Sequence, residues 1–511
     1  MNEINDWVPA PVPPEEASAA VPQPMTSPYV PRPPVPFVCD AHEKRLLGIA
    51  AGLGVALSEL LLWGTPGVSI LLLTGLAYAG IFAYGRGCAT FDARRGAILD
   101  VPIAVTTLCC AIFANEPLAM GNVLLLYFLL ALRIHRMFGH ALPEGCAALA
   151  ESGIAAPFCN AGAWFRTLRA PGRGARSRVA ARAALGGLIS IPVAAVVLAL
   201  LRSAEPAFDR AMNRLALHGS EAILHVWIDI CAGAVLAIFL FSLAYTARYG
   251  RPASQKSASN RLDSVIVGTV LVVCAGIYLC FFAVQFRYLF SAVWGHLPSE
   301  YIYAEYARRG FFELALVASI NLLLTHTALR TQSADRPGIQ VMVVVLSAET
   351  LVLIGSALSK MGMYIRVYGL TPLRLYTSVL MVGLALGFIG QIVARFVRVS
   401  MKNGVVIAAI ALYLALNLSA PNAVVAQWNV RHFESGALPT VDFELLRDLG
   451  ADAVPALIRL TTHGDAEIRA QAWDTLDAVE SDLCAASQDV RGVTLSGQIA
   501  RARIARLQKG R

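Results

Sequence analysis

Charged residues are scarce in this chain. Asp, Glu, Lys and Arg make up 15% of its 511 residues, whereas about 25% is typical of a soluble protein. Hydrophobic residues make up 57%, and they occur in long blocks that contain almost no charge. A water-soluble fold of this length could not bury so much apolar surface. The composition therefore excludes an ordinary soluble protein and predicts a multi-pass membrane protein.

The chain also lacks the common motifs of enzymes and metal sites. It contains no GxxxxGK[ST] phosphate loop, no HExxH and no GxSxG. None of its ten cysteines belongs to a CxxC pair, which leaves zinc-knuckle and thioredoxin-like sites without support. We therefore predict no metal and no cofactor, assign no catalytic residue, and favour a non-enzymatic protein.

Three parts are expected along the chain. Residues 1–40 hold eleven of the 26 prolines and too few apolar residues to fold, which predicts a disordered cytoplasmic tail. Residues 41–420 are predicted to form a polytopic transmembrane helix bundle. The polar residues 421–511 are helical in pattern and predict a small α-helical extracytoplasmic domain, which either packs on the membrane part or binds a protein partner. The predicted fold class is all-α.

Long apolar stretches define the expected membrane spans. A hydrocarbon core about 30 Å thick requires around 20 apolar residues per helix, and on this basis the sequence predicts about eleven spans. They are 46–63, 67–84, 97–114, 117–133, 184–201, 222–244, 264–285, 311–330, 338–358, 376–395 and 404–420.

Basic residues between the spans predict the orientation of the bundle. The net charge is +8, but no nucleic-acid-binding motif accompanies it, so we expect no nucleic-acid partner. Placing the N-terminus in the cytoplasm puts most Lys and Arg inside, and an odd number of spans then puts residues 421–511 outside. The most basic loop, 133–183, also contains Trp164 and Phe165 and is a candidate for binding anionic lipid headgroups, although orientation alone explains its charge. Its arginines are Arg133, Arg136, Arg166, Arg169, Arg173, Arg176, Arg178 and Arg182.

Ionisable side chains within a span are costly and must face protein or water. Glu349 lies near the middle of the 338–358 span, and Ser356 and Lys360 follow on the same helical stripe, which runs roughly 16 Å along the axis. Glu349 is a candidate proton- or cation-binding carboxylate at the base of an outward-facing cavity. The alternative is a protonated or paired Glu that locks two helices together.

A second polar face is predicted at the start of the 222–244 span. His218, Glu221, His225 and Asp229 recur at i, i+3, i+7 and i+11, which places them on one side of a helix. His225 and Asp229 are candidates for a proton relay or a polar contact. The outermost and innermost members are too far apart to share one metal ion. Ordinary helix packing is the alternative.

Two loops predicted to lie at the outer face carry a cationic and aromatic patch. Arginine side chains there suit phosphate or carboxylate recognition, because the guanidinium group offers two parallel donors. The alternative is salt-bridged anchoring of loops that cap the bundle. The candidate residues are Glu305, Arg308, Arg309, Arg366, Tyr368 and Arg374.

Several phrases of these loops and of the tail resemble a known family. The phrases are YAEYARRGFFEL (303–314), the stretch 356–371 that ends in YGLT, and Asn422 and Asn429 leading into 452–457. Together they resemble a bacterial family of multi-pass inner-membrane proteins defined by a domain of unknown function, over about residues 40–460. Lys360 stands where Arg is more usual in that family. The resemblance implies a bacterial inner-membrane location and brings no activity, substrate or catalytic residue.

Three functions remain open from the sequence. The first, which we favour, is a non-enzymatic envelope protein that binds a partner or lipid through its outer loops and helical tail. The second is a proton-linked transporter that uses Glu349 with Asp229 or His225. The third is a membrane-embedded transferase that acts at the outer-face patch beside Glu305.

Overall fold

The computed structural model describes most of the chain beyond residue 38. The described residues are 39–64, 67–139, 145–169, 220–250, 264–291, 311–330, 337–396, 402–486 and 492–509. Every regular element within these ranges is helical and none is a strand, which confirms the all-α fold class. The proline-rich tail predicted over 1–40 lies almost wholly outside the described residues.

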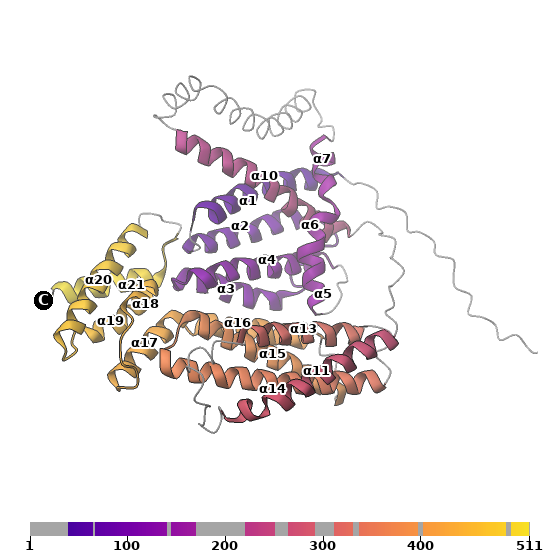
Figure 1. Cartoon of the computed structure of the whole chain (residues 1–511). Helices are drawn as coiled ribbons and strands as arrows, with labels where there is room; N and C mark the ends of the chain where they lie inside the picture. Colours follow the sequence, from indigo (N-terminus) through magenta and orange to yellow (C-terminus); the bar gives the residue numbers. More distant parts are fainter. Residues whose placement is uncertain are drawn as a thin grey trace, which may run out of the picture.

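The N-terminal helices form one bundle, in which the long helices lie roughly side by side (Figure 1). It is built from α1 (Ala41–Trp63), α2 (Val68–Gly85), the shorter α3 (Asp100–Ile112), α4 (Glu116–Phe138) and α10 (Ser220–Tyr249). Short helices cover one end of this bundle. They are α5 (Cys146–Leu149), α6 (Ala156–Cys159) and α7 (Ala161–Arg169), with a π-helical turn over 150–155 between α5 and α6.

Local sequence determines where α4 begins and ends. The side chain of Asn115 accepts a hydrogen bond from the backbone N–H of Leu118 at 3.1 Å, which satisfies one free donor of the first turn. Pro117 occupies that turn, where a missing N–H has no consequence. Gly139 follows the helix with φ of 77°, a left-handed conformation that favours glycine.

A second bundle lies beside the first. It comprises α11 (Ser264–Ser291), α13 (Phe311–Arg330), α14 (Pro337–Tyr368), α15 (Pro372–Phe396) and α16 (Lys402–Leu418). Helix α16 joins the two bundles: the Asn122 amide donates to Asn417 Oδ1 at 2.8 Å, and the Tyr413 hydroxyl donates to the Leu118 carbonyl at 3.2 Å. Polar side chains thus cross the interface between the bundles.

The C-terminal helices gather at one end of both bundles (Figure 1). They are α17 (Pro421–Glu434), α18 (Phe443–Asp448), α19 (Val454–Leu460), α20 (Ala466–Ala486) and α21 (Leu495–Lys509). Their buried apolar side chains share a core with Leu370 from the turn between α14 and α15. The backbone N–H of Val68, at the start of α2, also donates to the Val493 carbonyl at 3.1 Å. These helices therefore pack on the membrane part at the end where α1 stops.

The described residues contain fewer candidate membrane spans than the sequence predicted. Six described helices are long and apolar enough to cross a bilayer, or seven if α16 and α17, bent by 57°, count as one span. The six are Ala41–Trp63, Val68–Gly85, Pro117–Phe138, His225–Tyr249, Pro337–Tyr368 and Pro372–Phe396. Three other expected spans contain shorter apolar helical stretches of 10–17 residues, namely Ala97–Ile112, Val265–Phe281 and Glu313–Leu329. The span expected at 184–201 lies outside the described residues.

The bend between α16 and α17 has a local cause. Pro421 begins α17 and cannot donate a backbone hydrogen bond to α16. Ala420, directly before it, has φ of 50°, which a residue other than glycine rarely adopts. The chain therefore leaves the line of α16 at this point, and α17 turns into the C-terminal group of helices.

Candidate functional site

Small residues bring α1 and α10 into close contact. A Cβ atom added to Gly54 would lie 2.8 Å from the backbone nitrogen of Ala237, and one added to Gly233 would lie 2.8 Å from the Cα atom of Val55. Neither position can therefore take a larger side chain without moving a backbone. Close approach at small residues is the usual way that helices associate in membranes.

Asp229 lies at one end of this contact. Its Oδ1 atom accepts a hydrogen bond from Trp63 Nε1 at 3.0 Å, and Ser58 Oγ donates to the Asp229 carbonyl at 3.0 Å. The ring of His225 stacks on Trp63 at 3.7 Å. His225 and Asp229 therefore both contact Trp63 of α1, and these contacts hold two helices together. Of the other two residues of this face, His218 and the side chain of Glu221 lie outside the described residues.

An ion pair lies at the opposite end of the same contact. Glu43, which is fully buried, accepts from Arg248 Nη1 at 2.6 Å and from the Tyr249 hydroxyl at 2.8 Å. The sequence analysis missed this pair because 205 residues separate its members. A buried charge of this kind is tolerated because an opposite charge and a hydroxyl satisfy it.

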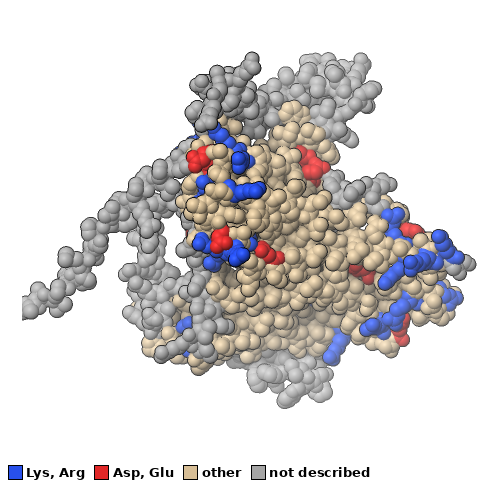
Figure 2. Space-filling model, turned by 180° about the vertical axis from the view of Figure 1, so that it is seen from behind, with Lys and Arg blue, Asp and Glu red and all other residues tan. Residues whose placement is uncertain are grey.

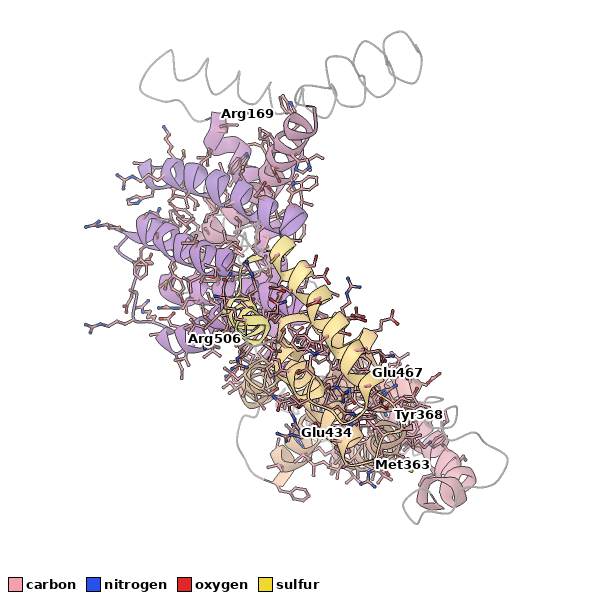
Figure 3. The ribbon with its side chains drawn as sticks, turned by 90° about the vertical axis from the view of Figure 1, so that its left-hand side faces the viewer. Arg169, Met363, Tyr368, Glu434, Glu467 and Arg506 are labelled. Atoms are coloured by element: carbon pink, nitrogen blue, oxygen red, sulfur yellow. The ribbon has the colours of Figure 1, made fainter. Side chains whose placement is uncertain are left out.

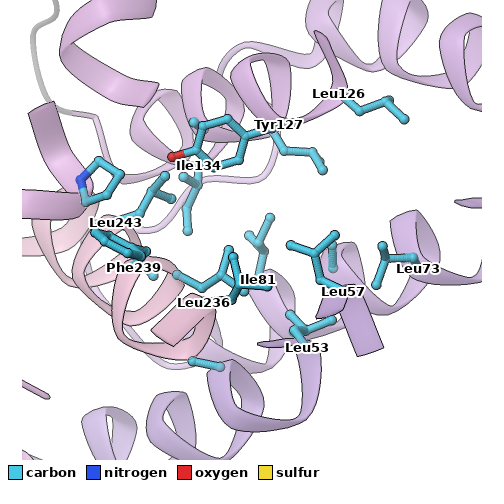
Figure 4. Close-up of a pocket in the computed structure, with 18 of the residues that line it drawn as sticks. Leu53, Leu57, Leu73, Ile81, Leu126, Tyr127, Ile134, Leu236, Phe239 and Leu243 are labelled. Carbon is cyan, nitrogen blue, oxygen red and sulfur yellow. The ribbon is translucent and has the colours of Figure 1, made fainter. Parts of the chain in front are cut away.

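Between these two ends, α1, α2, α4 and α10 enclose an apolar groove (Figure 4). Its volume is about 520 Å³, within the usual range of roughly 300–1,000 Å³ for small-molecule sites. Among the described residues that line it none is charged, and the few polar ones are Thr74, Tyr84 and Tyr127. The Tyr127 hydroxyl donates to the Gly153 carbonyl at 2.7 Å. The groove therefore offers an almost purely hydrocarbon surface.

The groove runs along much of the membrane thickness. Its lining begins on α1 at Leu46 and reaches Leu61, a rise of roughly 22 Å for an α-helix. All four helices that form most of its wall contain candidate membrane spans. Because the hydrocarbon core is about 30 Å thick, the groove is longer than one leaflet of the bilayer.

The second bundle contains a hydrogen-bonded chain of polar side chains across three helices. The hydroxyl of Tyr278 on α11 donates to Asn321 Oδ1 on α13 at 2.9 Å, and the Asn321 amide donates to Thr350 Oγ1 on α14 at 2.9 Å. Thr350 in turn donates to the Leu346 carbonyl at 2.7 Å. These side chains satisfy one another.

Glu349, adjacent to Thr350, takes no part in that chain. Its side chain is 9% exposed, and neither carboxylate oxygen has a hydrogen-bond partner among the described residues. Lys360, on the same helix, is also buried, whereas Ser356 is half-buried. Glu349, Ser356 and Lys360 therefore all lie on α14. Of the three, Glu349 is the buried residue whose side-chain oxygens have no hydrogen-bond partner among the described residues.

The outer-face patch is only partly described. Glu305, Arg308 and Arg309 lie outside the described residues. Arg374 donates to the Tyr368 carbonyl at 3.0 Å and to the Gly369 carbonyl, and its guanidinium lies 4.3 Å from the ring of Tyr364. It thereby closes the turn between α14 and α15, which favours the anchoring alternative for this residue.

Arg366 and Tyr368, by contrast, are exposed. Figure 3 shows Tyr368 beside the C-terminal helices that carry Glu434 and Glu467. The two side chains therefore remain available at the surface as candidates for the outer-face patch.

Two asparagines join the C-terminal helices to the membrane part. Asn429 accepts from the backbone N–H of Leu370 at 2.8 Å and donates to the Leu370 carbonyl at 2.7 Å. Asn115 donates to Asn422 Oδ1 at 3.0 Å and to the Tyr376 hydroxyl at 2.8 Å. Asn422 and Asn429 belong to the phrases that carried the family resemblance, but no site was predicted at them. The signal for this junction was their spacing of seven, which puts both on one face of a helix.

Asp452 lies close to this junction. It is 8% exposed, and one of its carboxylate oxygens has no partner among the described residues. Burial raises the pKa of the Asp452 carboxyl to about 6, an effect that a hydrogen bond from Ser496 opposes. Ser496 also accepts from the backbone N–H of Ala114 at 3.1 Å, so this carboxyl is next to a contact between α21 and the end of α3.

The basic loop 133–183 is described in part, since residues 140–144 and 170–183 lie outside. Trp164 is buried and its ring contacts Phe241 edge-on at 5.5 Å. It therefore packs inward, whereas Arg166 and Arg169 of the same helix are exposed. Seen from behind, charged side chains gather towards opposite sides of the molecule, and the surface between them is mostly uncharged (Figure 2). No described contact tests the binding of an anionic lipid by this loop.

Residues 100–460 match the family described as Domain of unknown function (DUF4153). The chain belongs to this family. No curated protein and no solved structure matches the chain. The match includes Glu349 and both junction asparagines, whereas α1 and α2, which supply one wall of the groove, precede it. Membership therefore brings no activity, and the membrane character of the chain rests on its long apolar helices.

Proposed function

We propose that this chain is a non-enzymatic membrane protein that holds the hydrocarbon chain of an anionic membrane lipid in the groove between α1, α2, α4 and α10. The observation that carries the proposal is an apolar cavity of about 520 Å³ between four candidate membrane spans. Such a surface gains free energy from apolar contact and offers almost nothing to a polar solute.

The length of the groove favours a long hydrocarbon chain. A span of roughly 22 Å along α1 exceeds one leaflet of a core about 30 Å thick. A small apolar solute would leave most of this wall without contacts, and packing contacts supply much of the binding free energy at such a surface.

Basic residues favour an anionic headgroup at the end near Tyr84. Arg86 directly follows the end of α2, two positions after Tyr84, and Arg136 lies on α4 two positions after Ile134. Tyr84 and Ile134 are groove-lining residues, and both arginines are exposed. A guanidinium at this depth can bind the phosphate of a lipid whose chain lies in the groove.

The same basic end supports a sidedness for the protein. We place the chain in a bacterial inner membrane with this end in the cytoplasm, because Lys and Arg accumulate on the cytoplasmic side of membrane helices. The C-terminal helices pack at the other end and are then extracytoplasmic. Cys146 and Cys484 are exposed at these two ends. In single-cysteine variants, a membrane-impermeant maleimide should label Cys484 in intact cells and Cys146 only after permeabilisation, and the reverse pattern would contradict the sidedness.

The lipid proposal is tested by mass spectrometry of lipids that remain bound after purification in a mild detergent. Ala77 on α2 lines the groove, whereas Ala79 on the same helix is exposed and does not. Ala77→Phe should fill part of the groove and reduce the bound anionic lipid several-fold. Ala79→Phe, the matched control, should leave it unchanged. Equal lipid content in the two variants and the unaltered protein would contradict the proposal.

A further inference from the structure

The second bundle contains one carboxyl group that packing does not explain. If Glu349 locked helices together, its oxygens would accept hydrogen bonds from a neighbouring helix. The Tyr278–Asn321–Thr350 chain already makes the polar contacts between α11, α13 and α14, and Glu349 receives none from the described residues. The helix-locking alternative is therefore not what the structure shows at this position.

The charge state of Glu349 follows from its surroundings. An ionised carboxylate without a hydrogen bond or counter-charge is very unfavourable inside a membrane bundle, and such groups become neutral instead. Lys360 is eleven residues away on the same helix, a rise of roughly 16 Å, so it does not neutralise Glu349 directly. A carboxyl group in this position is stable when it carries a proton.

Among the described helices, α11, α13 and α15 pack most extensively against α14. On α11, the Tyr278 phenol lies near Glu349, but its hydroxyl donates to Asn321. None of the described titratable groups on these helices makes a hydrogen bond or an ion pair with Glu349. These groups are Cys274, Tyr278, Cys280, Glu313, His326, Arg374, Tyr376 and Arg395.

A metal ion does not fit this position. The described residues contain no group of three or more His, Cys, Asp and Glu side chains that could hold one. A divalent cation prefers six or more oxygen ligands or a set of nitrogen and sulfur ligands. Glu349 alone supplies one carboxylate, which is enough for a proton and too little for such an ion.

We propose that Glu349 is a proton-binding site within the membrane, and that this carboxyl takes up and releases one proton while the side chains around it keep their hydrogen bonds. The site lies in a different bundle from the lipid groove and does not depend on it. A reversible proton site at membrane depth is the element that a proton-linked transporter requires.

The test is labelling of the whole purified protein with dicyclohexylcarbodiimide, followed by mass-spectrometric mapping of the modified residue. Hydrophobic carbodiimides react with protonated carboxyl groups in apolar surroundings. Glu349 should be modified, the rate should fall as pH rises, and Glu349→Gln should abolish the modification. Mapping in the unaltered protein keeps the test decisive even if that variant does not fold.

Glu43 is the matched control. It is buried like Glu349, but it forms an ion pair with Arg248 and accepts a hydrogen bond from Tyr249, so it should remain unmodified, and Glu43→Gln should leave the labelling of Glu349 unchanged. A Glu349 that does not react at any pH, or a rate that does not vary with pH, would overturn the proposal. Protection by sodium ions at constant pH would also overturn it and would indicate a cation site instead.

Discussion

The two bundles differ in how their buried carboxyl groups are bound. Between α1 and α10, Glu43 meets Arg248 and Tyr249, and Asp229 meets Trp63 and Ser58. In the second bundle, neither oxygen of Glu349 is bound within the described residues. A carboxylate that accepts hydrogen bonds from a neighbouring helix helps to hold the two helices together. A buried carboxyl that accepts none is available to bind a ligand such as a proton. The sequence places a carboxyl of each kind, Asp229 and Glu349, within an expected span. Only the hydrogen bonds seen in the structure distinguish them.

The largest expected effect on stability comes from removing the ion pair between Glu43 and Arg248. Arg248→Met leaves the Glu43 carboxylate buried without its counter-charge, and such a change costs about 3–5 kcal/mol. Thermal unfolding of the protein in detergent should show this loss. The double variant Arg248→Met with Glu43→Gln should recover most of it, and a single variant as stable as the unaltered protein would show that the pair does not hold α1 to α10.

A second test concerns the close contact between α1 and α10 at Gly54. Gly54→Leu forces side-chain atoms into the backbone of α10, and overpacking of this kind costs about 3 kcal/mol. Gly52→Leu is the matched control on the same helix, because nothing lies within 4 Å of a Cβ atom at that position. The stability of the two variants in detergent should differ clearly. Equal stability would mean that the close approach of α1 and α10 is not required.

Asp452 is an intermediate case, since one of its oxygens lacks a partner. Its folded-state pKa of about 6 lies above the ordinary value of 3.8, so the folded form holds the proton to a higher pH than the unfolded form. The stabilisation that results from this proton is fully present below about pH 4. It is lost as pH rises through 6, which lowers the free energy of unfolding by about 3 kcal/mol. Unfolding measured across this range should show the fall, and Asp452→Asn should remove it. A pH dependence that survives in Asp452→Asn would assign it to another group.

The smallest effect is expected at Glu349. A neutral carboxyl without a partner contributes little to packing, so Glu349→Leu should change the free energy of unfolding by less than about 1 kcal/mol or increase it. Glu43→Leu, which removes the carboxylate that pairs with Arg248, should be strongly destabilising. A loss at Glu349 as large as that at Glu43 would remove the distinction between the two bundles.

Sequence patterns predicted the long elements well. The apolar stretches 46–63, 67–84 and 338–358 correspond to α1, α2 and α14, because hydrophobic length is a local property. The stretch 97–114 looked similar but forms the short helix α3 together with a preceding turn, since apolar composition does not show where a helix begins or ends.

Interactions between distant segments could not be predicted. Asp229 was a candidate for a proton relay because it lies within a span. Its partners Ser58 and Trp63 are 171 and 166 residues away, so no local pattern indicates them. The groove was missed for the same reason, since four separate segments form it. Glu349 could be singled out from the sequence, because an acidic residue in the middle of an apolar stretch is a local signal, and its side chain is buried in the structure.

The central claim concerns the contents of the groove. It is tested most directly by electron cryomicroscopy of the whole protein in nanodiscs made from anionic and neutral phospholipids. The account predicts an elongated density between α1, α2, α4 and α10, continuous from the level of Leu61 to that of Leu46, with a headgroup beside Arg86 and Arg136. A groove closed by its own side chains, or one that holds ordered water, would contradict it.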